Sequence, residues 1–342
     1  MSSLSATEPV SAVLRVYAPA SVANVSVGFD ALGLALAPID GSLLGDIVEL
    51  RSAAVENTHL EDWQLTCTGP FAHRLPADPE QNIVLQCCRL YQQEMQKRGK
   101  AVHLAHVTLV KNLPIGSGLG SSATSVVATL EALNRWHGKL QGNPQGKPLG
   151  NPLSSREIFQ LMAIAEGGIS GEVHLDNIAP CLYGGLRLCP PSSNAEYALP
   201  WPVRWQTVVC WPGTELVTRE ARAVLPEQLP RKLVVNHGAQ FAQFVYALYT
   251  GKTRLAAASM QDLIAEPHRR KLLPGFEEAR VALKELGVLA VGISGSGPTV
   301  FAIADDMLVA EAAAQWLDQH YRKNDQGFVH VCRADLGGAR SI

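Results

Sequence analysis

PIGSGLGSSAT, residues 114–124, is the stretch of sequence that decides the fold. Its three glycines fall within five residues and allow backbone amides to approach a ligand closely. The run 102–110 before it is rich in Val, Leu and Thr and predicts a strand, whereas apolar residues recur at helical spacing from Ser121 onward. The turn is therefore expected between a strand and a helix N-terminus, where unpaired N–H groups and the helix dipole suit a phosphate.

Other uses of this turn fit its sequence less well. The turn contains neither a G-x-x-x-x-G-K-[ST] pattern nor a complete G-x-G-x-x-G pattern, which disfavours a Walker A loop and a dinucleotide fold. The chain has no G-x-S-x-G pattern, so a serine hydrolase is not indicated. The structural alternative is a turn that only reverses the chain. Ser121 and Ser122 argue against it, because hydroxyls at a helix start can bond phosphate oxygens or reach Mg²⁺. We expect a side chain at Gly118 to obstruct the contact with phosphate while leaving the fold largely intact.

Composition predicts a soluble chain of two domains. Of its 342 residues, 47% are apolar and 18% are charged, which is enough for more than one ordinary core. The formal net charge is −2 and the two signs are interspersed, so no nucleic-acid partner is expected. The N-terminus lacks a signal-peptide pattern, and the uncharged stretch 16–29 is broken by Pro19 and Asn24, so no membrane partner is expected.

The seven cysteines form no C-x-x-C pair. This spacing indicates neither a disulfide framework nor a zinc site. We interpret the cysteines as reduced, buried thiols, which fits a cytoplasmic location.

The remaining segments predict an α+β chain in two parts. The stretch 138–152 holds GNP twice and predicts a surface loop, and 190–194 is the best candidate for a linker between two domains. We expect strands at 13–18, 205–211 and 328–332, helices at 231–249, 276–286 and 307–321, and a strand–turn–strand unit at 288–304.

Three motifs together resemble those of the GHMP kinase family. They are YAPASVANVSVGFDALG at 17–33, the glycine-rich segment 114–124 and GISGSGPT at 292–299. The resemblance implies a two-domain GHMP kinase fold. An N-terminal ribosomal-protein-S5-like domain, residues 12–190, would hold the nucleotide loop, and a C-terminal ferredoxin-like domain would comprise residues 195–340. The substrate is then expected in the cleft between them.

Within this family, three further segments resemble the homoserine kinases of enteric-type bacteria. They are ISGEVHLDNIAPCLYGG at 169–185, TREARAVLP at 218–226 and AEPHRRKLLPGF at 265–276. The resemblance implies an ATP-dependent phosphotransferase that phosphorylates the side-chain hydroxyl of L-homoserine for threonine biosynthesis. Its implied cofactors are ATP and Mg²⁺, and it is compatible with a homodimer.

The same resemblance assigns site residues in this chain. The ATP phosphates would be cradled by Pro114, Ile115, Gly116, Ser117, Gly118, Leu119, Gly120, Ser121, Ser122, Ala123 and Thr124. The metal ligands would be Ser122 and Glu166. The amino-acid substrate would be bound by Asn24, Asp30, His174 and Arg222, and the catalytic group would comprise Asn177, Asp176 and Arg269. These residue types fit an amino-acid substrate, because a zwitterion requires an arginine for its carboxylate and a carboxylate or amide for its ammonium.

These side chains also have ordinary structural alternatives. Glu166 could be a solvated charge at a helix end, Asp30 a turn residue, and His174 a satisfied polar side chain. Arg222 and Arg269 could be surface charges, and the turn at Gly295 could be only a tight hairpin.

Two functional alternatives stay open at this stage. One is another GHMP small-molecule kinase of the mevalonate or sugar type, although the two arginines favour an amino acid. The other is a non-catalytic GHMP-fold binding protein, although the chain keeps both the glycine-rich loop and Glu166. Whether Asp176 is a base or binds the substrate ammonium is also open, whereas Asn177 can only orient the hydroxyl.

Overall fold

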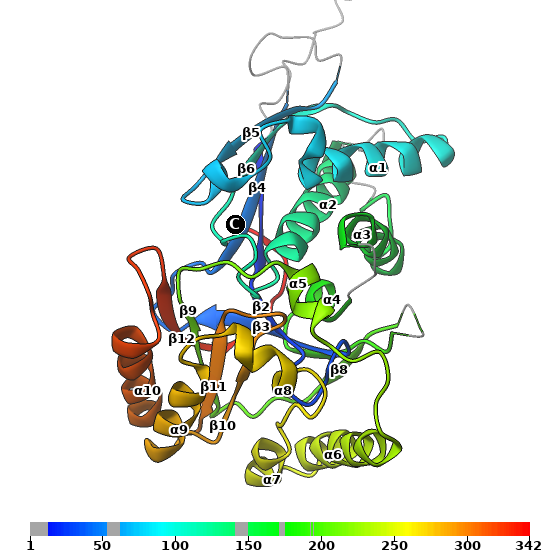
Figure 1. Cartoon of the computed structure of the whole chain (residues 1–342). Coiled ribbons are helices and arrows are strands. Elements are labelled where there is room, and N and C mark those ends of the chain that lie inside the picture. The colour runs from blue at the N-terminus through cyan, green and yellow to red at the C-terminus, as the bar shows by residue number, and fades with distance from the viewer. Residues whose placement is uncertain (1–12, 53–61, 141–149, 171–174, 192, 194) are drawn as a thin grey trace, which may run out of the picture.

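The computed structural model describes residues 13–52, 62–140, 150–170, 175–191, 193 and 195–342. Figure 1 shows two β-sheets with helices packed on them, which confirms the predicted α+β class. The strands are β1 (Val13–Pro19), β2 (Ser21–Ala23), β3 (Leu32–Pro38), β4 (Gly45–Ser52), β5 (Gln64–Thr68), β6 (Ala105–Val110), β7 (Leu186–Leu188), β8 (Tyr197–Leu199), β9 (Gln206–Trp211), β10 (Ala290–Ile293), β11 (Val300–Ala304), β12 (Phe328–Ala334) and β13 (Arg340–Ser341).

The first sheet has the strand order β13-β1-β4-β6-β5. Its pairs are antiparallel except for β5 with β6, which is parallel. Apolar side chains of β1 and β4, including Val16 and Val48, form a core with the helices that cover one face of this sheet (Figure 1). Asn82 caps the first of these helices by accepting the N–H of Val84 at 2.9 Å. The helices are α1 (Ile83–Lys97), α2 (Ser121–Leu140), α3 (Ser155–Ser170) and α4 (Leu175–Tyr183).

The second sheet has the order β10-β11-β9-β12-β3-β7-β8, and β2 pairs with β3 beside it. Apolar residues of β9 and β11 pack against α9 and α10, as Val208 and Val300 do within one cluster. No helix of the described ranges is both long and apolar enough to cross a membrane. The helices of this part are α5 (Thr218–Ala223), α6 (Arg231–Tyr249), α7 (Thr253–Ala258), α8 (Glu266–Arg269), α9 (Phe276–Glu285) and α10 (Met307–His320), and the short 3₁₀ helices of the chain are η2 (Ala72–Arg74), η3 (Pro79–Gln81) and η4 (Arg270–Leu272).

The glycine-rich loop lies where the sequence places it, between β6 and α2. The strand before it begins at Ala105 rather than 102, and α2 continues to Leu140, so the first residues of the expected surface loop 138–152 are helical. Residues 141–149 of that loop are outside the described residues. The helix expected at 231–249 agrees with α6 at both ends.

The segment 190–194 connects two strands of one sheet. β7 and β8 on its two sides pair antiparallel, with Leu186 opposite Leu199. The second sheet therefore takes β3 and β7 from the range 12–190 and its other main strands from the range 195–340. The C-terminal β13 pairs with β1, so the end of the chain returns to the first sheet. The division into ranges 12–190 and 195–340 stays a prediction.

Candidate active site

Four successive carbonyl oxygens of the glycine-rich loop are held by three other segments of the chain. The bonds are Leu216 N–H to Gly116 O at 3.1 Å, Thr299 N–H to Ser117 O at 3.1 Å, the Ser294 hydroxyl to Gly118 O at 2.6 Å, and Ser21 N–H to Leu119 O at 3.1 Å. In contrast, the N–H groups of Ser117, Gly118 and Gly120 have no acceptor among the described residues. A loop with its carbonyls bound and its amides available is suited to an anion.

The three glycines of the loop are required by its backbone. Gly116, Gly118 and Gly120 have φ values of +64°, +81° and +70°, in the left-handed region that glycine adopts without strain. A Cβ atom on Gly118 would lie 2.3 Å from the carbonyl oxygen of Ser294. The expectation that a side chain at Gly118 would leave the fold largely intact is therefore wrong, because the side chain would collide with the turn that follows β10. Its obstruction of phosphate stays a prediction.

The loop lines a cleft with a volume of about 940 Å³. Three of the eleven predicted ATP residues, Pro114, Leu119 and Thr124, do not line it, and Leu119 and Thr124 are fully buried. These three residues are therefore expected to stabilise the loop rather than to contact ATP. The eight that line the cleft are Ile115, Gly116, Ser117, Gly118, Gly120, Ser121, Ser122 and Ala123.

The cleft also brings together most of the predicted substrate, catalytic and metal-binding residues. His174 lies outside the described residues, and nothing follows for it. The others line the cleft: Asn24, Asp30, Ser122, Glu166, Asp176, Asn177, Arg222 and Arg269.

Ser122 and Glu166 meet between two helices, of which the sequence predicted only the one that begins at Ser121. The hydroxyl of Ser122, at the start of α2, donates to Glu166 Oε2 on α3 at 2.9 Å. Glu166 is only 9% exposed and burial raises its pKa, so the alternative of a solvated helix-end charge is wrong. No group of three or more His, Cys, Asp or Glu side chains that could hold a metal occurs in the described part of the chain. Two oxygen ligands fit Mg²⁺, which usually takes one or two protein ligands together with phosphate oxygens.

Charges of both signs line another part of the cleft. Arg222 on α5 donates to Asp30 Oδ1 at 2.9 Å. Asp176, in the first turn of α4, is 3% exposed, and its Oδ1 has no hydrogen-bond partner within the described ranges. Burial, followed by the charge of Asp30, raises the pKa of Asp176 to about 7. A buried acceptor beside an ion pair is an arrangement that a cationic ligand group would complete.

Arg269 and Asn24 both bind the turn that follows β10. Arg269 NH1 donates to Gly295 O at 2.9 Å, and Asn24 Nδ2 donates to the same oxygen at 3.1 Å. Arg269 is 3% exposed, so it is not a surface charge. The turn at Gly295 is thus more than a hairpin, because it contacts the loop and both of these side chains.

The backbone at Asn24 is in a rare conformation. Asn24, Val25 and Ser26 have successive φ values of +68°, +46° and +58°. A β-branched residue such as Val25 is seldom found there. Strain of this kind is concentrated at ligand sites, where the surrounding structure maintains it.

Asn177 lies directly beside the loop. Its Oδ1 accepts the hydroxyl of Ser21 at 2.8 Å, and a Cβ atom on Gly120 would lie 2.8 Å from the same oxygen. This bond fixes the orientation of the amide and leaves Nδ2 as its donor. The resemblance placed Asn177 next to a hydroxyl of the substrate, and the structure places its amide against Gly120 of the loop.

The cleft has residues that the sequence did not reveal. Leu75 and Pro76, between η2 and η3, and Ile83, the first residue of α1, add apolar side chains to the lining besides the predicted Ile115, and these three belong to no motif. Thr218 and Arg219 precede Arg222 by about one helical turn, in a segment that the resemblance had selected. Lys111, just before the loop, also lines the cleft. Its position directly after the strand β6 is the only signal in the sequence that could have indicated it.

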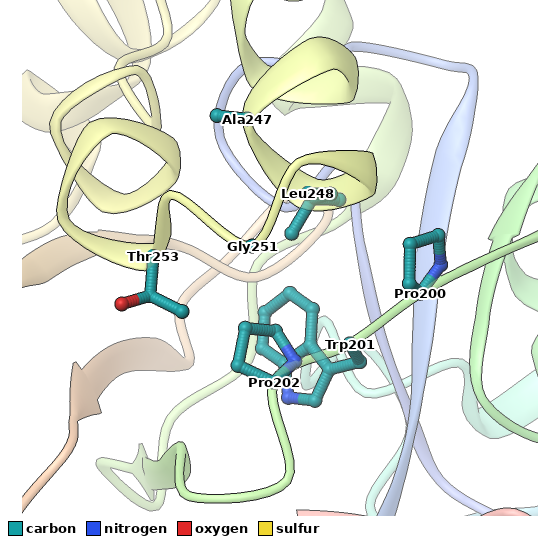
Figure 2. Close-up of a pocket in the computed structure, with 7 residues that line it drawn as sticks. All are labelled: Pro200, Trp201, Pro202, Ala247, Leu248, Gly251 and Thr253. Atoms are coloured by element: carbon teal, nitrogen blue, oxygen red, sulfur yellow. The ribbon is translucent and has the colours of Figure 1, made fainter.

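A second cavity of about 120 Å³ lies away from the cleft, between the segment 200–202 and the turn joining α6 to α7 (Figure 2). Its lining is mostly apolar, with Trp201 and Leu248 on opposite sides. No titratable side chain lines it. The chemistry of the chain is therefore assigned to the larger cleft.

Comparison with protein families gives two matches. Residues 82–185 match the model of the GHMP kinases N-terminal domain, and residues 244–323 match that of the GHMP kinases C-terminal domain. The first match contains the loop, Glu166, Asp176 and Asn177.

Solved structures resemble the whole chain. A homoserine kinase from Cytophaga hutchinsonii is 31% identical, with a TM-score of 0.84, and the alignment covers 98% of this chain and 99% of that one. A protein of Listeria monocytogenes assigned as a homoserine kinase is 23% identical, with a TM-score of 0.65 and coverage of 96% and 99%. The mevalonate kinase of L. major, in complex with R-mevalonate, is 16% identical, with a TM-score of 0.65 and coverage of 97% and 99%. The last two resemble this chain in fold alone.

Proposed function

The chain belongs to the GHMP kinase family, and from that premise we propose that it transfers the γ-phosphate of ATP to the side-chain hydroxyl of L-homoserine. Kinases of this family phosphorylate small molecules with ATP, so the chain is a small-molecule phosphotransferase. The product would be O-phospho-L-homoserine, a compound of threonine biosynthesis. The similarity to the Cytophaga hutchinsonii homoserine kinase supports this choice of substrate.

The observation that carries the proposal is the group formed by Asp30, Arg222 and Asp176. A guanidinium suits the carboxylate of an amino acid, and two carboxylates suit its ammonium. Mevalonate has a carboxylate but no ammonium, and a sugar has neither. Because Asp176 is buried without a partner for Oδ1 in the described structure, a substrate that lacks a cation would leave this costly group unsatisfied.

The glycine-rich loop and the apolar region beside it support ATP as the phosphate donor. The N–H groups of Ser117, Gly118 and Gly120 would bind phosphate oxygens, and Leu75, Pro76 and Ile83 would contact the base. Ser122 and Glu166 fit Mg²⁺ as oxygen ligands that meet at 2.9 Å. When bound, Mg²⁺ would neutralise charge on the phosphates.

The proposed chemistry relies on positioning rather than on a strong base. The transition state of phosphoryl transfer is loose, so the attacking hydroxyl loses its proton late and must chiefly be aimed at phosphorus. Asn177, fixed by Ser21, would orient the hydroxyl beside the loop. Asp176 would bind the ammonium, and Arg269 would hold the turn at Gly295 against the site.

A panel of acceptors with Mg²⁺ and ATP tests this proposal by the rate of ADP release. We expect homoserine to exceed serine, which is one methylene shorter, by about 10- to 200-fold in kcat/KM. Mevalonate and galactose should give little turnover, and threonine serves as a second amino acid with a displaced hydroxyl. Turnover of mevalonate equal to or faster than that of homoserine would refute the proposed substrate.

A further inference from the structure

A buried carboxylate joins both ends of the glycine-rich loop to the first sheet. Asp46 on β4 is 0% exposed. Its Oδ1 accepts the N–H groups of Asn112 at 3.0 Å and Leu113 at 3.1 Å, just before the loop. Its Oδ2 accepts the hydroxyls of Thr124 at 2.8 Å and Ser125 at 2.7 Å, in the first turn of α2. One side chain therefore fixes the two points between which the loop runs.

Lys111 completes this buried network. Its ammonium donates to Asp46 Oδ2 at 2.5 Å, to Ser121 O at 2.7 Å and to Ser125 Oγ at 3.0 Å. These three bonds use all three of its donors, which a cation that is 2% exposed requires. The bond to Ser121 O connects Lys111, the residue that follows β6, to the first residue of α2.

We propose that Asp46 is a positioning residue for phosphoryl transfer, which holds the loop and the start of α2 in the arrangement that binds the phosphates of ATP. Asp46 does not line the cleft, so it acts through the residues that it binds. The inference rests on the proposed function only in taking the loop as the nucleotide site. It is independent of which hydroxyl compound accepts the phosphate.

The physical reason is the flexibility of the loop. Three glycines in the left-handed region leave the free backbone with many alternative conformations, and ordering them opposes binding. A loop that is already fixed at both ends presents its N–H groups without that cost at the moment of binding. The contacts to other segments hold the middle of the loop, whereas Asp46 holds both ends.

The dissociation constant for ADP with Mg²⁺, measured by calorimetry, tests this role without an acceptor substrate. In Asp46→Asn the amide oxygen can still accept the N–H groups of Asn112 and Leu113. The amide NH₂ group, however, is a donor and replaces Oδ2, which accepted the Lys111 ammonium and the hydroxyls of Thr124 and Ser125. We expect this variant to bind ADP at least about 10-fold more weakly, the smallest effect typical of a lost bond to a charged group.

Asp335→Asn is the matched control for the loss of a buried carboxylate. Asp335 is 4% exposed, its Oδ1 accepts the N–H groups of Gly337 and Gly338 at 2.9 Å each, and it pairs with Arg340. It lies in the segment between β12 and β13 and does not line the cleft. We expect Asp335→Asn to lower the melting temperature and to bind ADP as the wild type does.

Thr124→Val provides a milder variant in case Asp46→Asn does not fold. It keeps the shape of a fully buried side chain outside the cleft and removes one hydroxyl, which bonds to Asp46 Oδ2 at 2.8 Å and to Ser121 O at 3.0 Å. We expect it to weaken ADP binding several-fold in the same direction. Wild-type affinity for ADP in Thr124→Val and in folded Asp46→Asn would overturn the proposal. If the wild type binds ADP but phosphorylates another acceptor, the substrate proposal fails and the role of Asp46 stands.

Discussion

The environment of Asp176 disfavours the negative charge of its carboxylate. The side chain is buried on α4, close enough to Asp30 for that charge to disfavour its own ionisation, and its pKa is raised to about 7. A substrate ammonium needs the ionised form. Near neutral pH, Asp176 is therefore expected in both protonation states before substrate binds, and a bound cation should favour the carboxylate.

The first prediction at this scale concerns pH. Because only the ionised Asp176 binds the ammonium well, kcat/KM for homoserine should fall as pH is lowered through about 7, approaching tenfold per unit. The value of kcat at saturating homoserine should stay nearly flat over the same range, since bound substrate keeps Asp176 ionised. Asp176→Asn should have a low kcat/KM that no longer follows this titration. Steady-state kinetics between pH 5 and 9 measure all three.

A different profile would identify Asp176 as a base. In that case kcat itself would fall tenfold per unit below an enzyme pKa and would become low and flat in Asp176→Asn. Asn177→Leu should instead lower kcat in either mechanism, because it removes the amide that orients the hydroxyl beside the loop.

The second prediction concerns Arg222, which pairs with Asp30 across the cleft. Arg222→Leu should raise KM for homoserine by about 10- to 150-fold, the value of a charge-assisted bond to the substrate carboxylate, with a smaller effect on kcat. Arg322→Leu is a matched control, because Arg322 is similarly exposed, at 28% against 29%, and pairs with Asp318 on α10 away from the cleft. Equal KM values in the wild type and Arg222→Leu would contradict recognition of the carboxylate by Arg222.

At the scale of elements, the site is made where two glycine-rich turns meet. The loop between β6 and α2 contacts the turn between β10 and β11 through the Ser294 hydroxyl, which donates to Gly118 O at 2.6 Å. The two turns lie 176 residues apart in the sequence. Their approach is so close that Gly118 has no room for a Cβ atom.

The third prediction follows from this contact. Gly118→Ala places a methyl group 2.3 Å from Ser294 O and should lower the free energy of unfolding, in addition to weakening ADP binding. Gly41→Ala is the control, because Gly41 has nearly the same φ, +80° against +81°, and no atom within 4 Å of its Cβ position. Denaturation in urea should show a cost of about 1–2 kcal/mol for Gly41→Ala and about 1–3 kcal/mol more for Gly118→Ala. Equal losses in the two variants would show that the turns can separate freely.

The sequence predicted these elements well where the signal is local. The helices expected at 231–249 and 307–321 and the strand–turn–strand unit expected at 288–304 depend on neighbouring residues, and the structure has α6, α10 and the β10–β11 unit there. The sequence predicted contacts between distant residues poorly. Nothing in the surroundings of Asp46 indicates five hydrogen bonds, because its partners lie 65 to 79 residues away.

At the scale of the whole molecule, the chain crosses repeatedly between its two sheets. β3 begins within the first motif, 17–33, and pairs with β12 near the C-terminus (Figure 1). β13, at the end of the chain, pairs with β1. Such long-range pairing cannot be read from periodicity, which is why a linker was expected at 190–194 where β7 and β8 pair. The resemblance to a family supplied the parts of the site that are distant in sequence. The motifs of a family mark segments that contribute to one site, even where those segments lie far apart in the sequence.

The most direct test of the account is the identity of the phosphorylated product when the wild-type chain is incubated with Mg²⁺, ATP and L-homoserine. Phosphorus-31 NMR and mass spectrometry of the mixture distinguish the products. We predict a phosphate monoester whose phosphorus signal is split by the two protons of the side-chain carbon that carries the oxygen, formed in equal amount with ADP. Homoserine recovered unchanged from this mixture, while another acceptor of the panel is phosphorylated in a parallel incubation, would contradict the account.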